Sequence, residues 1–387
     1  MIGGKPMGLG GTLGKMAHTW CGSLLKGAFM SVRFRWMALV GGVSLGFGSA
    51  VMAQPDPSGI EFVTVGDVGN ANWFGAGDNN GRGAVDYEYK IGKFEVTTAQ
   101  WVEFMNAAFD RPANDPINFV ASPNQWSAVA TTPNTSGARR WTVPAGSEVM
   151  PVGGITWRTA AIYCNWLHNG KSSLRANFRS GAYDVTTFGG GPTFRDQLTR
   201  SAGALYWIPS LDEWMKASHW DPSRNGEGEG GWWTYSNGSE SPFVYGPPGA
   251  LVNGAPANAN AGWDIFDFPG SNPFAVPLGA YASETPFGLR DAAGGTTEWT
   301  EGIFQEPFEQ FPRGRVFEGS TRGETAFPLT DTTGYYRGSN SPSFQDSSFG
   351  FRVAAAVPGT GPFGLMVLGF LRYCGRRRAN LFNIAKP

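Results

Sequence analysis

The stretch Phe287-Gly-Leu-Arg-Asp-Ala-Ala-Gly-Gly-Thr-Thr-Glu-Trp299 combines a glycine-rich turn with two carboxylates and large apolar residues. Asp291 and Glu298 are seven residues apart, which is too far for one helical turn. A loop at Gly294-Gly295 brings both carboxylates toward one centre, because glycine adopts backbone conformations that other residues avoid. The alternative is a surface turn whose acidic side chains are only solvated.

Short elements are predicted on both sides of this stretch. Apolar patterns predict strands over Ile60–Val65, Val85–Ile91 and Phe349–Val353. Three helices are predicted: one opened by the capping box Thr97-Thr-Ala-Gln100, one from near Thr156, and one after Pro209-Ser210. Residues 59–356 contain no repeat and no low-complexity block, so one domain fits them better than two.

Composition favours a loop-rich globular body. The chain has 387 residues with 56 Gly, 27 Pro, 14% aromatic and 16% charged residues. These values exclude collagen, a coiled coil and a disordered tail, and they indicate aromatic packing rather than long helices. A formal net charge of -1 gives no indication of nucleic-acid binding.

Charge is distributed unevenly along the chain. Residues 1–54 and 359–387 each carry five basic residues and no acidic one, which leaves a net charge of -11 between 55 and 358. Basic, apolar ends around an acidic body indicate segments that export or membrane machinery handles.

The N-terminal segment has the order of a secretory signal. Arg33 and Arg35 precede the apolar run from Trp36, and small residues follow up to Ala53, after which we expect cleavage. The alternative is a short buried helix. Translation starts at Met30, or the signal has a long leader from Met1. The expected division is a leader and signal peptide over 1–53, a domain over 54–358, and a tail over 359–387.

The tail carries Phe363-Gly-Leu-Met-Val-Leu-Gly-Phe-Leu371 and then Arg376-Arg-Arg378. The apolar run is about half of the ~20 residues that a spanning helix needs. The tail resembles the bacterial PEP-CTERM sorting signal, although Val357-Pro-Gly-Thr360 stands where that family has Val-Pro-Glu-Pro. An incidental tail and a peripheral membrane anchor are the alternatives.

Several stretches in the same order resemble the formylglycine-generating enzyme, or sulfatase-modifying factor, family. They cover about residues 60 to 356. Besides the stretch quoted above, they include Tyr89–Thr97, Met150–Leu167, Trp207–Trp214, Glu318–Ser320 and Arg337–Val353. The resemblance implies a mixed α+β, C-type-lectin-like fold with little regular secondary structure.

The resemblance also shows what is missing. Catalytic members carry a copper-binding cysteine pair, and soft sulfur ligands select Cu(I). Those positions fall near Gly323 and Pro328, and the sequence has no cysteine from 165 to 373. The oxidase chemistry is therefore expected to be absent, with no copper and no catalytic residue assigned. Cys164 is expected to be a buried, inert thiol.

A sister branch of the family uses iron held by several histidines. This body offers only His168 and His219, which we do not expect to bind iron. Trp232, Trp233 and Tyr235 could stack on a sugar, but loop or core packing is the preferred interpretation.

The family pattern places calcium at Asp291, Gly294, Thr296 and Glu298, with oxygen ligands that this ion prefers. A second family site would use Asn260 and the Ala261 carbonyl, with Asp264 or Asp267 as an unassigned acidic partner.

Two functions follow from these interpretations. The first is an exported, non-catalytic binding or scaffold module of the cell envelope, at the periplasm, cell surface or outside. Its partner would be an unknown protein or glycan ligand, and it would be a monomer that the tail associates with the membrane. The alternative is a formylglycine-generating oxidase, or a related enzyme of altered chemistry, that acts on exported proteins.

Overall fold

The computed structural model describes residues 56–109, 130–131, 141–322 and 331–358, with 130–131 described as backbone only. All of them belong to one compact unit, Gln54–Pro387. The predicted signal peptide and sorting tail lie outside the described residues. No helix among the described residues is long and apolar enough to span a membrane.

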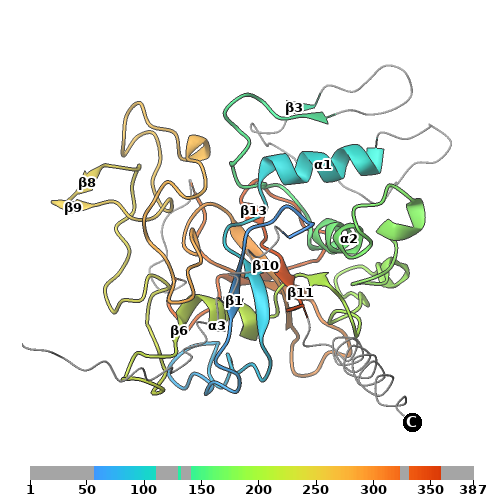
Figure 1. Ribbon diagram of the computed structural model, residues 1–387, viewed down its shortest axis with the longest axis horizontal. Coiled ribbons are helices and arrows are strands. Elements are labelled where there is room, and N and C mark those ends of the chain that lie inside the picture. The colour runs from blue at the N-terminus through green and yellow to red at the C-terminus, as the bar shows by residue number, and fades with distance from the viewer. Residues whose placement is uncertain (1–55, 110–129, 132–140, 323–330, 359–387) are drawn as a thin grey trace, which may run out of the picture. The chain divides into compact units, whose positions relative to one another are not determined.

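Two four-stranded sheets form the framework (Figure 1). The first has the order β1-β2-β14-β5, and all of its pairings are antiparallel. Its strands are β1 (Phe62–Val65), β2 (Tyr89–Gly92), β14 (Ala354–Ala355) and β5 (Tyr206–Trp207).

The second sheet has the order β12-β11-β10-β13, with β10 and β13 parallel. Its strands are β10 (Thr297–Phe304), β11 (Gly314–Glu318), β12 (Gly338–Asn340) and β13 (Phe349–Gly350). An irregularity between Trp299 and Ile303 interrupts the register of β10 with β11.

The remaining strands form short pairs: β3 (Ala130–Thr131) with β4 (Trp141–Thr142), β6 (Trp220–Asp221) with β7 (Gly231–Trp232), and β8 (Leu251–Val252) with β9 (Ala255–Pro256). The 3-10 helices are η1 (Arg175–Phe178), η2 (Val185–Thr187) and η3 (Pro273–Ala275). The fold is therefore α+β with little regular secondary structure, as the sequence predicts.

The three predicted helices are α1 (Thr98–Phe109), α2 (Trp157–His168) and α3 (Leu211–His219). The capping box before α1 is present, because Thr97 N–H donates to Gln100 Oε1 at 3.0 Å and Gln100 N–H donates to Thr97 Oγ1 at 3.2 Å. Ser210 and Glu213 form a second capping box at the start of α3. Side chains thus satisfy backbone donors that a helix start leaves open.

Aromatic side chains fill the core between α1, α2 and the chain near β13. Trp101 and Tyr163 stack with ring centroids 5.5 Å apart, and Phe104, Trp166 and Phe351 pack around them. All five are nearly or fully buried. Figure 1 shows α1 and α2 together above and to the right of the sheets, with α3 below them near β6.

All three predicted strands were too long, and the first, Ile60–Val65, is observed only as β1 (Phe62–Val65). The predicted strand Val85–Ile91 is observed only from Tyr89, in β2. Val85 lies in a loop instead, where its N–H donates to Asn70 Oδ1 at 3.0 Å and its carbonyl accepts from the Gly69 N–H at 2.9 Å. The predicted strand Phe349–Val353 is wrong as a single strand. Its start is β13 in the second sheet, and the chain then crosses to β14 in the first sheet.

Arg352 lies at this crossing and is 0% exposed. Its Nε and Nη2 donate to the two carboxylate oxygens of Glu298 in β10, each at 2.6 Å. Nη1 also donates to the carbonyls of Gly92 and Lys93, at 3.1 and 3.2 Å, and Nη2 to that of Arg290 at 3.2 Å. One guanidinium therefore ties both sheets together.

We expect Arg352→Met to lower the free energy of unfolding by about 3–5 kcal/mol, because it leaves the Glu298 carboxylate buried without its cation. Arg352→Lys should also destabilise, since an ammonium cannot reproduce the fork of donors. Urea unfolding measures both changes.

The matched control is Glu61→Gln, which breaks the surface pair of Lys93 and Glu61 at 3.0 Å. It should cost less than about 1 kcal/mol, as exposed pairs do. Equal losses for Arg352→Met and Glu61→Gln would contradict the structural role given to Arg352.

Candidate functional site

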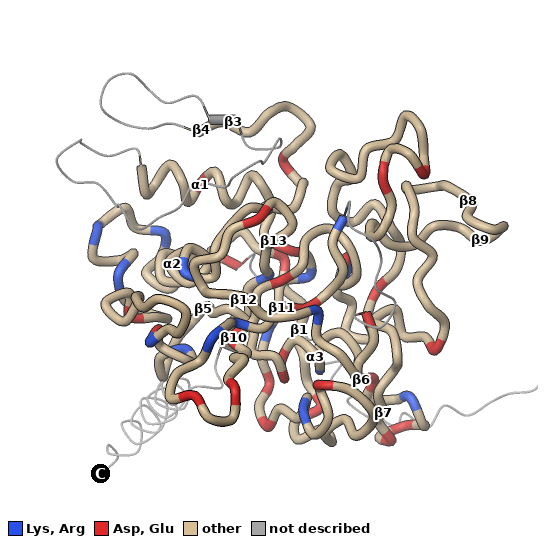
Figure 2. The backbone as a smooth tube through the Cα atoms, turned by 180° about the vertical axis from the view of Figure 1, so that it is seen from behind, with Lys and Arg blue, Asp and Glu red and all other residues tan. Residues whose placement is uncertain are grey.

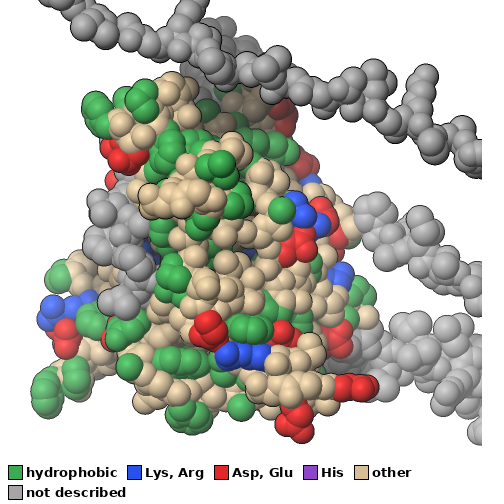
Figure 3. All heavy atoms as spheres, turned by 90° about the vertical axis from the view of Figure 1, so that its left-hand side faces the viewer, with side chains coloured by type: hydrophobic (Ala, Val, Ile, Leu, Met, Phe, Trp, Pro, Cys, Tyr) green, Lys and Arg blue, Asp and Glu red, His purple; other side chains and the backbone are tan. Residues whose placement is uncertain are grey.

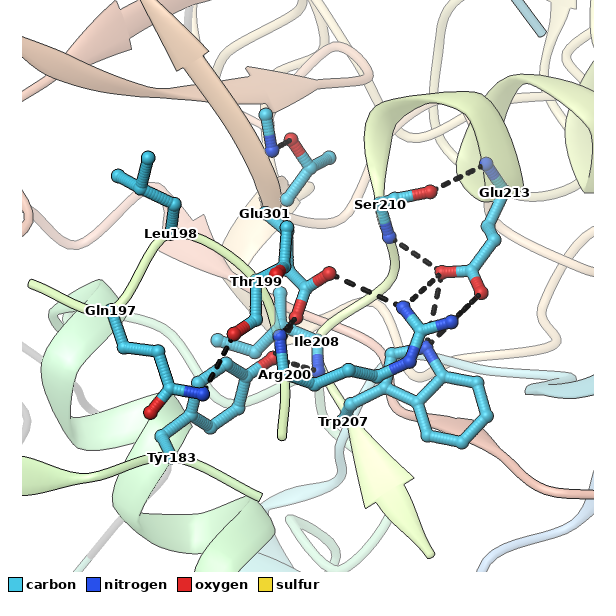
Figure 4. Close-up of polar contacts among 12 residues, drawn as sticks. Tyr183, Gln197, Leu198, Thr199, Arg200, Trp207, Ile208, Ser210, Glu213 and Glu301 are labelled. Atoms are coloured by element: carbon cyan, nitrogen blue, oxygen red, sulfur yellow. Dashed lines mark hydrogen bonds and ion pairs between the residues drawn. The ribbon is translucent and has the colours of Figure 1, made fainter. Parts of the chain in front are cut away.

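A second cluster of charges, with two buried carboxylates, surrounds the partly exposed Arg200 (Figure 4). The Arg200 Nη2 donates to Glu213 Oε1 at 3.0 Å, and Nη1 reaches Glu301 Oε2 at 3.3 Å. The backbone N–H of Arg200 donates to Glu301 Oε1 at 2.7 Å. Figure 4 shows the guanidinium between the two carboxylates. Arg200 therefore forms ion pairs with two acidic side chains.

Three separate parts of the chain position this cluster. Glu213 lies in the first turn of α3, where its carboxylate also accepts from the Ser210 N–H at 2.7 Å. Glu301 lies in β10. Arg200 belongs to the loop that leads into β5, so the cluster joins this loop to both a helix and the second sheet.

Aromatic side chains enclose the guanidinium. Arg200 Cζ lies 4.1 Å from the ring centroid of Trp207, within the range of a cation–π contact. Tyr87 accepts from Arg200 Nη2 at 2.8 Å and donates to Glu213 Oε1 at 2.7 Å. Tyr183 donates to Glu301 Oε1 at 2.6 Å. Each carboxylate is thus held in one orientation.

A cavity of about 600 Å³ opens beside the cluster. Its lining consists of residues 199–204 and 356–357 together with Tyr87, Glu88, Trp207, Ser210 and Glu301. Volumes of about 300–1,000 Å³ are typical of small-molecule sites. The Arg200 side chain is 21% exposed, so this cluster is accessible, unlike that of Arg352.

Burial and neighbouring charges shift the pKa values of Glu301 and Arg200. Burial raises the pKa of Glu301 to about 7, and Glu213 adds to this rise while Arg200 opposes it. Burial alone would lower the pKa of Arg200, but Glu213 and Glu301 raise it above its usual range. The guanidinium therefore stays charged, while Glu301 titrates near neutral pH.

The predicted calcium residues lie around the loop at Gly294. Asn260 and Gly294 form an isolated parallel bridge, and the Asn260 carbonyl accepts from Gly295 N–H at 3.1 Å. Asn260 Oδ1 and Thr296 Oγ1 are buried and have no hydrogen-bond partner. Both are hard oxygen atoms of the kind that calcium accepts.

The two predicted carboxylate ligands have other partners. Glu298 forms the buried pair with Arg352 and also accepts from Trp214 Nε1 at 3.0 Å. Asp291 accepts from Gly279 N–H at 2.7 Å and has a left-handed backbone with φ of 54°. The cation next to Glu298 in the structure is therefore the guanidinium of Arg352.

In the described part of the chain, no group of three or more His, Cys, Asp or Glu side chains could hold a metal ion. Asp264 and Asp267, the acidic residues considered for a second site, bond to each other's backbone N–H in a local turn. The predicted calcium ligands include carbonyl and amide oxygens besides carboxylates. The absence of a cluster of those four side-chain types therefore does not decide whether calcium binds, and calcium binding stays a prediction.

The residues do not fit a copper site of the cysteine-pair type. Gly323 and Pro328, the expected positions of the pair, lie outside the described residues, and neither side chain contains sulfur. Cys164 is the one cysteine that the structure describes, and it is fully buried on α2. Burial raises the pKa of its thiol, which disfavours the reactive thiolate.

The histidines have structural partners. His168 Nδ1 accepts from the Leu205 N–H at 3.0 Å. His219 is buried next to Thr333 Oγ1 at 3.2 Å, and burial lowers its pKa to about 3, so it is neutral.

The three aromatic residues considered for sugar stacking pack within the body. Trp232 Nε1 donates to the Ala71 carbonyl, and Trp233 Nε1 donates to Asp221. Tyr235 is 8% exposed.

Sequence reasoning missed the Arg200 cluster. The local signal was the spacing of Ser210 and Glu213 in a capping box, which explains the helix start but not the contact with Arg200. Glu301 is 101 residues from Arg200 in sequence, and no pattern connects them.

Glu301→Gln should change how stability depends on pH. Because the folded pKa of Glu301 is above its value of 4.5 in an unfolded chain, the folded state holds more protons between these values. Its contribution to stability is therefore full below pH 4.5 and is lost as pH rises to about 7.

Between pH 4.5 and 7.5, stability of the wild type should fall relative to Glu301→Gln by about 3 kcal/mol. Denaturant unfolding at several pH values measures this, with the exposed Glu227→Gln as control. Parallel profiles for the wild type and Glu301→Gln would contradict the assignment.

Comparison with known proteins agrees with this architecture. The model of the sulfatase-modifying factor enzyme 1-like domain, FGE-sulfatase, matches residues 67–357. No curated protein matches the chain.

Solved structures that match include CarF, at 18% identity and a TM-score of 0.44 over 77% of this chain and 98% of that one. Treponema denticola variable protein 1 matches at 16% identity and a TM-score of 0.40, over 77% and 95%. PvdO from Pseudomonas aeruginosa matches at 15% identity and a TM-score of 0.41, over 77% and 92%. With three quarters of its length matched by the family model, the chain belongs to the FGE-sulfatase, sulfatase-modifying factor enzyme 1-like, family.

Proposed function

We propose that this chain is a non-enzymatic binding module of the cell envelope, built on the family fold but without the oxidase chemistry. The observation that carries the proposal is the number of cysteines in the domain. Catalytic members of the family use a cysteine pair for copper-dependent oxidation, because soft sulfur ligands select Cu(I). This sequence has only Cys164 between residues 22 and 373.

The surroundings of Cys164 support the same conclusion. Its side chain is fully buried within α2, where neighbouring aromatic residues exclude solvent. A raised thiol pKa removes the thiolate that a nucleophile or a metal ligand requires. A cavity of about 600 Å³ beside Arg200 provides space for a ligand without requiring a reactive group.

We propose that the module is exported and that its tail associates it with the envelope. The proposal rests on the basic, apolar and small residues up to Ala53 and on the basic, apolar tail. N-terminal sequencing of the mature protein would then begin at or near Gln54.

The purified protein, supplied with copper and oxygen, should leave a Cys-x-Pro-x-Arg peptide unmodified. Mass spectrometry with a carbonyl-reactive reagent detects the aldehyde, and an active oxidase of the family is the positive control. Aldehyde formation above the level without enzyme would overturn the proposal and support the alternative, an oxidase or an enzyme of altered chemistry.

Calcium is a further part of the proposal, at the predicted set of the Asp291 and Glu298 carboxylates and the Gly294 and Thr296 carbonyls, which stand in one glycine-rich motif. If these groups bind the ion, calcium should stabilise the fold by about 2.7 kcal/mol at a hundred times its Kd.

EDTA should then lower the melting temperature of the wild type, and Asp291→Asn should abolish this sensitivity. Asparagine suits the test because it also tolerates a left-handed backbone. The exposed Asp86→Asn is the control. An unchanged melt after chelation, with no calcium in the purified protein, would remove calcium from the proposal.

A further inference from the structure

The cavity beside Arg200 has neutral rather than ionic character. Arg200 already has two carboxylate partners, and Glu301 titrates near pH 7 because it is buried. An anion entering the cavity would meet Glu88, Glu213 and Glu301. A cation would have to compete with Arg200 for Glu213 and Glu301, and the exposed Glu88 carboxylate offers it little attraction. Either ion therefore gains little, since the charges within the cluster compensate one another.

The walls offer what a polyhydroxylated ligand needs. Planar hydrogen-bonding groups come from Arg200 and the exposed Glu88, and the hydroxyl-bearing residues Thr199 and Ser201 also line the cavity. Carboxylates accept hydrogen bonds, guanidinium groups donate them, and hydroxyls do both. This mixture matches an array of ligand hydroxyls.

Tyr87 provides an aromatic surface at the edge of the cavity. The residue is 39% exposed, although its hydroxyl is held between Arg200 and Glu213. A ring fixed in this way offers rigid apolar area with little loss of conformational entropy on binding. The C–H-rich face of a sugar ring is the apolar partner that such a surface suits.

The geometry points to a binding site for a neutral saccharide in the cavity between Tyr87 and residues 199–204. The ligand places one sugar face on the Tyr87 ring and its hydroxyls toward Arg200, Glu88 and the hydroxyls of Thr199 and Ser201. This inference rests on the proposed binding function and names its ligand class.

The face around β8 and β9 is a weaker candidate (Figure 3). It exposes Leu251, Ile265 and Phe266, but it offers few charged groups to orient a ligand. By contrast, Figure 2 shows both signs of charge near β10 and α3, which carry the cluster.

Isothermal titration and saturation-transfer NMR on the full chain test the inference. The probes are maltotriose, cellotriose and chitotriose, with tri-lysine and trigalacturonic acid as charged comparisons. At least one neutral trisaccharide should bind, and the two charged probes should not. No binding of any neutral trisaccharide, or binding of only a charged probe, would overturn the inference.

Variants of cavity residues test whether the ligand binds in the cavity. Ala202→Trp fills it from an exposed wall position and should weaken binding at least tenfold. Leu205→Trp, in the same loop but outside the lining, should leave binding unchanged. Tyr87→Ala should lose binding, whereas Tyr87→Phe should weaken it less, as expected for a ring that stacks.

Thermal melts confirm that each variant is folded, and Tyr87→Ala carries the test if Ala202→Trp does not fold. Saccharide binding that none of these folded variants weakens would place the ligand elsewhere and overturn the inference. The aldehyde assay is independent of these titrations. Failure of saccharide binding therefore rejects this inference alone, whereas aldehyde formation rejects the proposed function.

Discussion

The pairing of Arg352 with Glu298 is the contact on which the arrangement of the two sheets depends. Removing both charges from water costs several kcal/mol per ion, and only near-ideal geometry offsets that cost. The pair meets this condition, with two 2.6 Å hydrogen bonds and backbone carbonyls that accept the remaining donors. Because Arg352 lies between β13 and β14, the same pair fixes where the chain leaves one sheet and enters the other.

Local signals predicted the helices well. Each helix begins at a capping residue that hydrogen-bonds within three positions, so the signal is contained in a few neighbouring residues. Strand limits depend on distant partners instead. Phe349–Val353 has a suitable apolar pattern for one strand, but β10 pairs with its start while β2 and β5 pair with the chain that follows.

The candidate site shows the same division between local and distant information. Asp291, Gly294 and Glu298 stand in one motif, so the sequence could group them, yet it could not show that Arg352 faces Glu298. The Arg200 cluster gathers residues from a loop, a helix and a strand. Its members are ordinary charged residues in the sequence, and only the folded chain gives them buried, shared partners.

The two arginine clusters use the same chemistry in different surroundings, and this difference separates structure from function. Arg352 is fully buried, so all of its donors must be satisfied within the protein, and it has no access to a ligand. Arg200 holds two carboxylates from the edge of a cavity, with 21% of its side chain exposed. A guanidinium held rigidly there can form a further contact without a large entropic cost. The fold thus uses one arginine to join its sheets and keeps another, already oriented, where a ligand can reach it.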